Sequence, residues 1–442
     1  MMSKWQWLWA QLTRTLWLRA SLFAIFAIIV ALLATLAQWI LPSEWEYGIG
    51  ADAVDRILNI LASSMLAVTT FSLSVMVSAY GAATSNVTPR ATRLLMQDTT
   101  TQNVLATFIG SFLFSLVGLI ALSTNAYSDA GRFVLFIVTI AVVVLIVITI
   151  LRWISHLSNF GRVGDSSRRV EEAAARALNA RIKSPCLGGR PLTDAVTIPD
   201  SAEPVYAEQV AYIQHIDIAG LADKADDYQA QVFLLVLPGD FVHPKRVIGY
   251  VDLPHPQPGL EHAEIYAPEY RQRAFEQLRD KLSRSLTLGH FRSFDQDPRF
   301  GLSVLAEIAS RALSPAVNDP GTAIDILSRA VRVLTPLPDQ QAPSHGDDMP
   351  YARVWVPMLN SADLLDDVFT PIARDGASLI EVQLRLQKSL LALHQIYHGE
   401  LRRQVKAQAE LAYERARQAL TMGDDRTRLK HCMRGYHNSP ER

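Results

Sequence analysis

The sequence predicts a membrane α-helical protein with four transmembrane helices and a cytoplasmic α+β region, in which a small β-sandwich-like module precedes a helical domain. Three observations lead to this fold class. The first third of the 442 residues contains four long apolar segments, and the basic residues between them alternate from loop to loop. From about residue 161 the chain has the mixed charge of a soluble protein. The low overall fraction of charged residues, 19%, is typical of a chain that is partly embedded in lipid.

Four segments are long and apolar enough to cross a bilayer, which takes about 20 mostly apolar residues. They are 21–41, 57–80, 104–122 and 133–154, and together they predict a transmembrane domain over residues 21–160. Residues 1–20 place Trp5 and Trp9 on one helical face. Because tryptophan concentrates at the level of the lipid headgroups, this segment predicts an interfacial helix.

Lys and Arg gather in three of the five segments that flank or connect the four spans. These are the N-terminus, the 81–103 loop and the segment after the fourth span, whereas the other two loops hold one Arg each. Under the positive-inside rule, the three basic segments share one side only if there are four spans and both termini are cytoplasmic. The sequence therefore predicts a multi-pass protein of the bacterial inner membrane, with the lipid bilayer as its partner.

The second span is apolar but carries a row of hydroxyl groups. Ser63, Thr70, Ser74 and Ser78 follow one another at steps of 7, 4 and 4 residues, which places them on one face of a helix. Small residues let helices approach closely, so the row predicts helix packing. Hydroxyl groups also suit the lining of a wet path, and both uses stay open from the sequence.

Beyond the spans, four further segments are expected. Residues 161–200 form a stalk and linker, 201–258 a small β-rich module, 259–420 a helical cytoplasmic domain, and 421–442 a frayed tail. The last helix of the helical domain is expected over 378–420, because its apolar residues form one stripe.

Segment 292–323 reads as a loop, a helix, a tight break and a second helix. Asp297 precedes Pro298 at the first helix, and Asn318 or Asp319 caps the second one with Pro320 in its first turn. Oxygen-rich loops near a helix N-terminus can hold a cation or a phosphate. The candidate polar cytoplasmic site comprises Asp295, Asp297, Glu307, Arg311, Asn318 and Asp319. The alternative is that Glu307 and Arg311 form an i,i+4 salt bridge and the others are caps.

Other patterns give little support for catalysis or for a cofactor. His394 and His398 have an i,i+4 spacing that can bind zinc, but no H-E-x-x-H motif accompanies them, and a structural role is favoured. The acids at 363, 366 and 367 suit a helix start. The sequence lacks Walker, G-x-S-x-G, kinase and Rossmann motifs, so neither an enzyme nor a cofactor is expected. A net charge of −1 indicates no nucleic-acid partner, and the two cysteines indicate reduced thiols without a metal site.

Two stretches resemble a known family. SSMLAVTTFSLSVMVSAYGAATSNVTPR at 63–90 and FDQDPRFGLSVLAEIASRALSPAVNDPGTA at 294–323 are similar to the bacterial predicted membrane protein family known as domain of unknown function 2254. The resemblance implies a multi-span N-terminal part and a cytoplasmic C-terminal part, and it names no reaction. Residues 211–221 and 237–253 also resemble the half-repeats of a biotinyl/lipoyl-like β-sandwich. Because the lysine that such domains modify is missing, that resemblance implies a structural or adaptor module.

Two hypotheses follow for function. The first is a homo-oligomeric channel or transporter-like protein that passes a small solute or ion along the hydroxyl row, with a cytoplasmic domain for gating and assembly. The alternative is a membrane-anchored sensor or scaffold whose cytoplasmic domain binds a ligand or partner at segment 292–323. A membrane enzyme is less favoured, because no nucleophile–base pair is visible.

Overall fold

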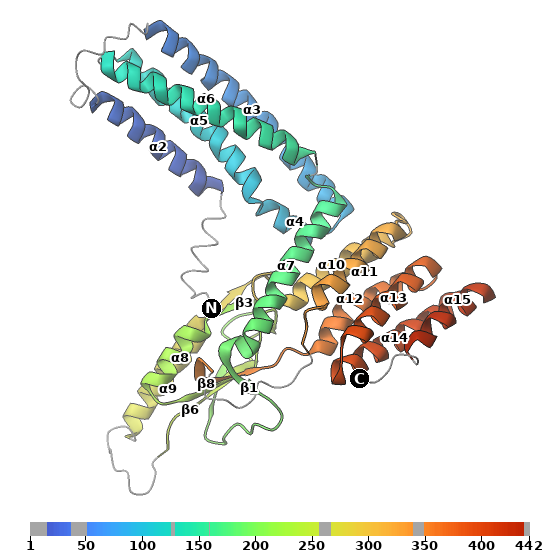
Figure 1. The fold of residues 1–442 in the computed structure, drawn as a ribbon. Coiled ribbons are helices and arrows are strands. Elements are labelled where there is room, and N and C mark those ends of the chain that lie inside the picture. Colours follow the sequence, from blue (N-terminus) through green and yellow to red (C-terminus); the bar gives the residue numbers. More distant parts are fainter. Residues whose placement is uncertain are drawn as a thin grey trace. The chain divides into compact units, whose positions relative to one another are not determined.

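The computed structural model describes residues 16–36, 51–124, 129–158, 160–255, 267–338 and 349–436. The chain forms two compact units, which we call the membrane unit, Leu8–Ser166, and the C-terminal unit, Ser167–Arg442. Figure 1 shows the elements of both units. Each unit has its own hydrophobic cores.

Five helices make up the described part of the membrane unit. They are α2 (Leu16–Leu36), α3 (Ala51–Asn86), α4 (Pro89–Met96), α5 (Thr99–Ser123) and α6 (Asp129–Leu157). Three helical segments are long and apolar enough to cross a membrane: Ala53–Ser85, Thr99–Ser123 and Gly131–Leu157. They correspond to the second, third and fourth predicted spans.

The first predicted span coincides with α2, in which a shorter apolar stretch runs over Ser21–Val30. The end of that span at 37–41 and most of the predicted interfacial helix, residues 1–15, lie outside the described residues. Three candidate spans are therefore found among the described residues, and the fourth stays a prediction.

Helix α5 occupies the centre of the membrane unit. In its apolar window 56% of the residues are buried, against 28% in α3 and 22% in α6. Thr107, Ser111 and Ser115 are buried on α5, at the four-residue spacing by which small side chains let neighbouring helices approach. A side chain at Gly110 would collide with Phe23 of α2, so the two backbones approach closely at this point.

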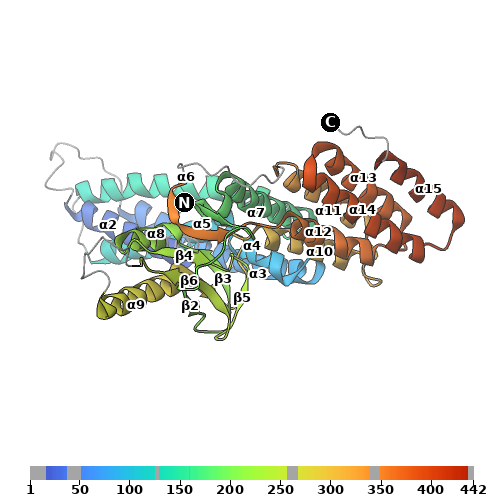
Figure 2. The ribbon, with the colours of Figure 1, turned by 90° about the horizontal axis from the view of Figure 1, so that it is seen from below.

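The strands of the C-terminal unit form two sheets. The larger has the order β1-β8-β4-β6-β2 and the smaller the order β5-β3-β7. The strands are β1 (Gly189–Leu192), β2 (Glu203–Tyr206), β3 (Ala211–Ile216), β4 (Gln231–Leu234), β5 (Phe241–Val242), β6 (Val247–Asp252), β7 (Leu286–Gly289) and β8 (Tyr351–Pro357). Helices α8 (Ile218–Asp227) and α9 (Pro268–Ser285) lie against these strands and share one hydrophobic core with them (Figure 2).

The predicted β-sandwich-like module is not confirmed, because the strands belong to an α/β region. Strands β1, β7 and β8 come from outside residues 201–258, and β8 pairs in parallel with both β1 and β4. Asp217 caps α8 through the Gly220 N–H, so a helix stands between β3 and β4. The segment expected as a linker contains β1, which follows a left-handed turn at Cys186 and Leu187.

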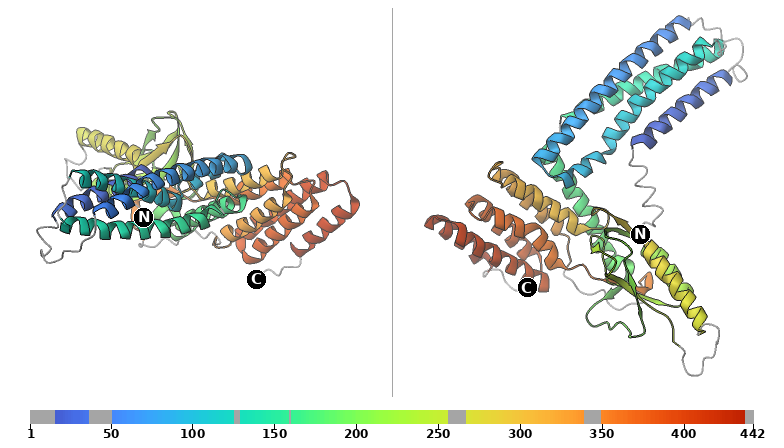
Figure 3. Two further views of the ribbon diagram at one scale, coloured as in Figure 1. Left: turned by 90° about the horizontal axis from the view of Figure 1, so that it is seen from above. Right: turned by 180° about the vertical axis from the view of Figure 1, so that it is seen from behind.

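The remaining helices of the C-terminal unit lie side by side in Figure 3. They are α10 (Pro298–Ala312), α11 (Pro320–Leu334), α12 (Ser361–Asp375), α13 (Ile380–Ile396), α14 (Gly399–Ala419) and α15 (Gly423–Met433), and a short helix η3 (Arg434–Tyr436) ends the described chain. The expected stalk helix is α7 (Val163–Lys183), which begins in the membrane unit and continues into the C-terminal unit.

Two predictions for this region were wrong. The single helix expected over 378–420 is divided into α13 and α14, because the chain turns at Tyr397 and His398 and Gly399 has a φ of +51°. The tail expected to fray from residue 421 instead forms α15 and η3. Leu429 and Tyr436 are buried there, which supplies the packing that holds the segment in place. Residues 437–442 of that tail lie outside the described residues.

Candidate functional site

The hydroxyl row of α3 faces away from the other helices of its own unit. Ser63, Thr70, Ser74 and Ser78 are all exposed. The buried positions of the same helix lie on the opposite side, at Val54, Leu58, Met65, Ser72 and Ala83. Because Ser74 follows Met65 by nine residues, the two point in opposite directions on a helix of 3.6 residues per turn. The packing of the row against helices of the same chain, which the sequence also favoured, is not what the structure shows.

Most hydroxyl groups of the row donate to their own helix. Ser63 Oγ donates to the Asn59 carbonyl at 3.0 Å, Thr70 Oγ1 to the Leu66 carbonyl at 3.0 Å, and Ser74 Oγ to the Thr70 carbonyl at 3.1 Å. A hydroxyl bonded in this way carries no unsatisfied donor into lipid, and its oxygen keeps acceptor capacity. The row therefore presents outward-facing acceptors, and exposing them costs a single chain little free energy.

The six residues of the predicted polar site do not converge. Asp295 and Asp297 precede the start of α10, while Asn318 and Asp319 follow its end. A helix of 15 residues is about 22 Å long, so the two pairs are separated by its whole length. Glu307 and Arg311 lie along it, half-buried and exposed respectively. The predicted residues of segment 292–323 therefore lie at both ends of α10 and along it, and they do not form one binding site.

The capping roles of this segment are confirmed. Asp297 accepts a hydrogen bond from the Phe300 N–H at 3.0 Å, and Asp319 accepts one from the Thr322 N–H at 3.0 Å. Asn318 adopts a left-handed conformation, with a φ of +50°, in the turn between the two helices. Hydrogen bonds from Thr322 hold the pKa of Asp319 below its ordinary value.

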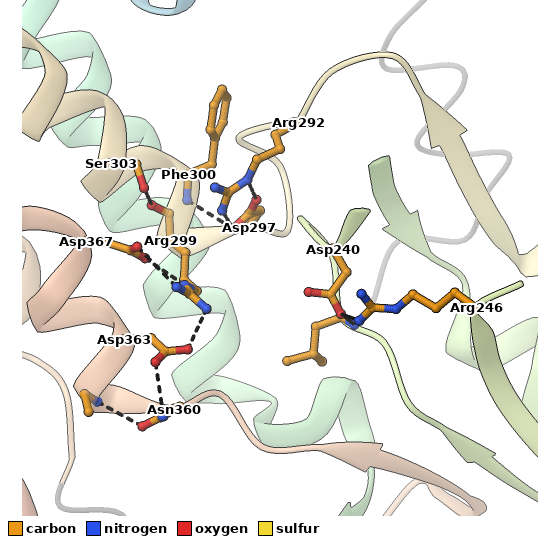
Figure 4. Close-up of polar contacts among 12 residues, drawn as sticks. Asp240, Arg246, Arg292, Asp297, Arg299, Phe300, Ser303, Asn360, Asp363 and Asp367 are labelled. Atoms are coloured by element: carbon orange, nitrogen blue, oxygen red, sulfur yellow. Dashed lines mark hydrogen bonds and ion pairs between the residues drawn. The ribbon is translucent and has the colours of Figure 1, made fainter. Parts of the chain in front are cut away.

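The start of α10 is instead a buried ionic junction (Figure 4). Arg292 donates to the Asp297 carboxylate through Nε at 2.8 Å and Nη2 at 3.0 Å. The side chain of Asp297 is only 2% exposed. Burial raises the pKa of Asp297, and the bonds from Arg292 and the Phe300 N–H offset part of that rise. Gly239, with a φ of +101°, packs so closely on this carboxylate that a side chain there would collide with it.

A second arginine at this helix start neutralises the acids of α12. Arg299 bonds Asp363 at 2.5 Å and Asp367 at 2.7 and 3.2 Å, as Figure 4 shows. Its hydrogen bond with Asp367 raises the pKa of Arg299. Asp366 accepts a bond from Thr370 instead. The acids at 363, 366 and 367 are therefore engaged by protein groups, and the pair at 363 and 367 ties α12 to α10.

Arg181 brings α7 to the same junction. It is buried and donates to the Gln296 carbonyl at 3.4 Å. Burial lowers the pKa of Arg181 to about 10, a value at which the group is still charged at neutral pH. Glu171 on α7 binds Arg329 at 2.7 Å and Arg332 at 2.6 Å, both from α11. These contacts join α7, α10, α11 and α12 into one polar framework, in which Arg181 Nη1 is buried without a hydrogen-bond partner.

His394 has the structural role that its sequence context favoured, whereas His398 is exposed. His394 accepts a hydrogen bond from Arg402 Nε at 3.2 Å, and burial lowers its pKa. His398 stands outside α13, at the start of α14, so the two imidazoles do not share one helix face. Among the described residues no group of three or more His, Cys, Asp or Glu side chains is placed to hold a metal ion.

One cluster of side chains was not predicted from the sequence. At the start of α5, Asp98 lies 2.9 Å from His156 Nε2 of α6 and accepts the Thr101 hydroxyl at 2.6 Å. The imidazole lies against the rings of Trp153 and Phe160. Asp98 and His156 are far apart in sequence and no periodicity connects them. The capping pattern of Asp98 before Thr101 was the only local signal.

A family described as "Predicted membrane protein (DUF2254)" matches residues 13–392. Uncharacterized proteins from Mycobacterium bovis and Mycobacterium tuberculosis are each 24% identical over 329 residues, which is 73% of this chain. The chain spans 60% of the length of these curated relatives. No solved structure matches.

Proposed function

We propose that this chain, which belongs to the DUF2254 family of predicted membrane proteins, forms homo-oligomers in the bacterial inner membrane and passes a small solute or ion. In this proposal α2 is the fourth span, and both termini lie in the cytoplasm, as the distribution of Lys and Arg indicates. The C-terminal unit assembles the subunits and gates the path. The proposed function involves no catalytic step.

The observation that supports this proposal is the direction of the hydroxyl row on α3. The row faces outward from a unit that packs its helices around α5, so the described helices of one chain do not enclose a path along it. When copies of α3 face one another around an axis, the hydroxyl oxygens become neighbours and can replace part of the hydration of a solute. Oxygen-lined and constricted pores select their solutes in this way.

The test is flux through liposomes that contain the purified full-length protein. Replacing Thr70 and Ser74 together by Leu places bulky apolar groups on the row, and we expect flux to fall to the level of protein-free liposomes. Val147→Leu is the matched control, because Val147 is an exposed apolar residue on α6, away from the row. Unchanged flux in the double variant, or a monomeric mass of the wild-type protein in detergent, would overturn the proposal.

A further inference from the structure

A surface cavity of about 480 Å³ lies between α13 and the α15–η3 segment of the C-terminal unit. Its lining includes Gln387, Lys388 and Leu391 from α13 and His431, Cys432 and Arg434 from the end of the described chain. Cavities of a few hundred cubic ångströms hold small organic ligands. The cavity is distant in sequence from the α3 row and plays no part in the proposed path.

The walls of this cavity are held by buried contacts. Tyr436 donates its hydroxyl to the Gln387 carbonyl at 2.9 Å, and Gln387 Nε2 donates to the Ala409 carbonyl at 3.0 Å. Gly435 packs so closely on Leu391 that a side chain there would press into it. The segment that carries His431 and Arg434 is thus fixed against α13, and the cavity is a formed feature of the fold.

The charge of the lining is one-sided. Lys388, His431 and Arg434 are exposed, and within the part of the chain that the structure describes their side chains have no ion-pair or hydrogen-bond partner. The lining includes no Asp or Glu. Three arginines outside the lining, Arg403, Arg417 and Arg428, each pair instead with a nearby acid of their own helix.

We propose that this cavity binds a phosphate group carried by a small molecule or by a lipid headgroup. Arginine and lysine are the side chains that bind phosphate most often, and three neighbouring basic groups without an acid favour a multiply charged anion. The cavity is larger than a bare phosphate ion needs, and Leu391 provides an apolar surface for the group that bears the phosphate. This inference goes beyond the proposed path and is tested without any measurement of flux.

The alkylation rate of Cys432 can report whether the cavity is occupied. Its thiol lines the cavity and is partly exposed, whereas the other cysteine, Cys186, is buried at 2% exposure. The full-length protein in detergent is treated with N-ethylmaleimide, and the rate of Cys432 alkylation is followed by mass spectrometry of its peptide. One arm adds pyrophosphate, and the other adds dihexanoyl phosphatidylglycerol, with dihexanoyl phosphatidylcholine as the zwitterionic control.

We expect at least one of pyrophosphate and the anionic lipid to slow the alkylation of Cys432 about tenfold at saturation, with the difference between arms identifying the source of the phosphate. Lys388→Ala with Arg434→Ala should raise the ligand concentration for half-protection about tenfold or more. Lys430→Ala is the matched control, since Lys430 is an exposed cation of α15 outside the lining. The proposal is overturned if neither probe protects Cys432, if the zwitterionic lipid protects it equally, or if Lys430→Ala weakens protection as much as the double variant.

Discussion

The outward face of α3 and the start of α10 both concentrate polar groups, but they satisfy them in opposite ways. On α3 the hydroxyls bond their own backbone and face outward, away from the unit. At α10, Arg292 bonds the buried carboxylate of Asp297, and the partly exposed Arg299 bonds Asp363 and Asp367 of α12. The polar groups at α10 hold elements of one unit together, whereas the hydroxyl row of α3 is left uncovered by the described helices of its own unit.

The largest effect on stability is expected from breaking the contact between Arg292 and Asp297 at the start of α10. Asp297→Ala removes the cap of α10 and leaves Arg292 without its carboxylate partner, so the free energy of unfolding should fall by about 3 kcal/mol or more. Urea denaturation of the full-length protein in detergent, followed by circular dichroism, measures this loss. Asp319→Ala is the control, because this exposed cap should contribute only about 1 kcal/mol. Equal losses in the two variants would show that the junction at Asp297 is no more than a cap.

A smaller effect should come from the pH dependence of the α7–α11 contact. Burial opposes ionisation of Glu171, but hydrogen bonds from Arg332 and Arg329 outweigh it and hold its pKa below the ordinary value of 4.5. A carboxylate with a lowered pKa in the folded state contributes stability above pH 4.5, and this contribution is lost as the pH falls.

Glu171→Gln should therefore lose less stability than the wild type as the pH falls from about 5 to about 3, when thermal unfolding of the two proteins is compared across that range. Glu172→Gln, one residue along the helix, is a suitable control, since Glu172 forms an exposed i,i+4 pair with Arg168. If the two variants show the same pH profile, the contact of Glu171 with α11 contributes no more pH-dependent stability than an exposed ion pair.

The smallest effect is expected on the outward face. Thr70→Val with Ser74→Ala removes hydroxyls that bond only their own helix, so the stability of one copy should change by no more than about 0.5 kcal/mol. Ser111→Val on α5 is the contrasting variant, because Ser111 is buried at 4% exposure and overpacking there should cost about 1 to 3 kcal/mol. Unfolding in mixed detergent micelles at high dilution measures both. A loss in the α3 variant as large as that of Ser111→Val would contradict an outward-facing role for the row.

Much of what is local in this fold was predictable from the sequence. The three apolar spans follow from length and hydropathy, and the packing face of α5 follows from the spacing of Thr107, Ser111 and Ser115. The caps at Asp297 and Asp319 follow from an acid that precedes a proline in the first turn. Each of these signals lies within a few residues of the feature that it predicts.

What could not be predicted depends on residues that are distant in sequence. The pairing of β1 with β8 has no local signal, and short strands are hard to distinguish from linkers without their partners. The same holds for Asp98 and His156 and for Arg299 with the acids of α12. The candidate polar site failed for a related reason, since residues that look close in the sequence are separated by the length of the helix between them.

The position of β8 in the larger sheet has a consequence for biosynthesis. Strands β1 and β4 emerge from the ribosome long before β8, which pairs with both of them. Until β8 is translated, both strands keep an unpaired edge, which is a known risk for aggregation. The membrane unit is synthesised first. A nascent chain already inserted in the bilayer would be kept apart from other nascent chains until β8 is translated.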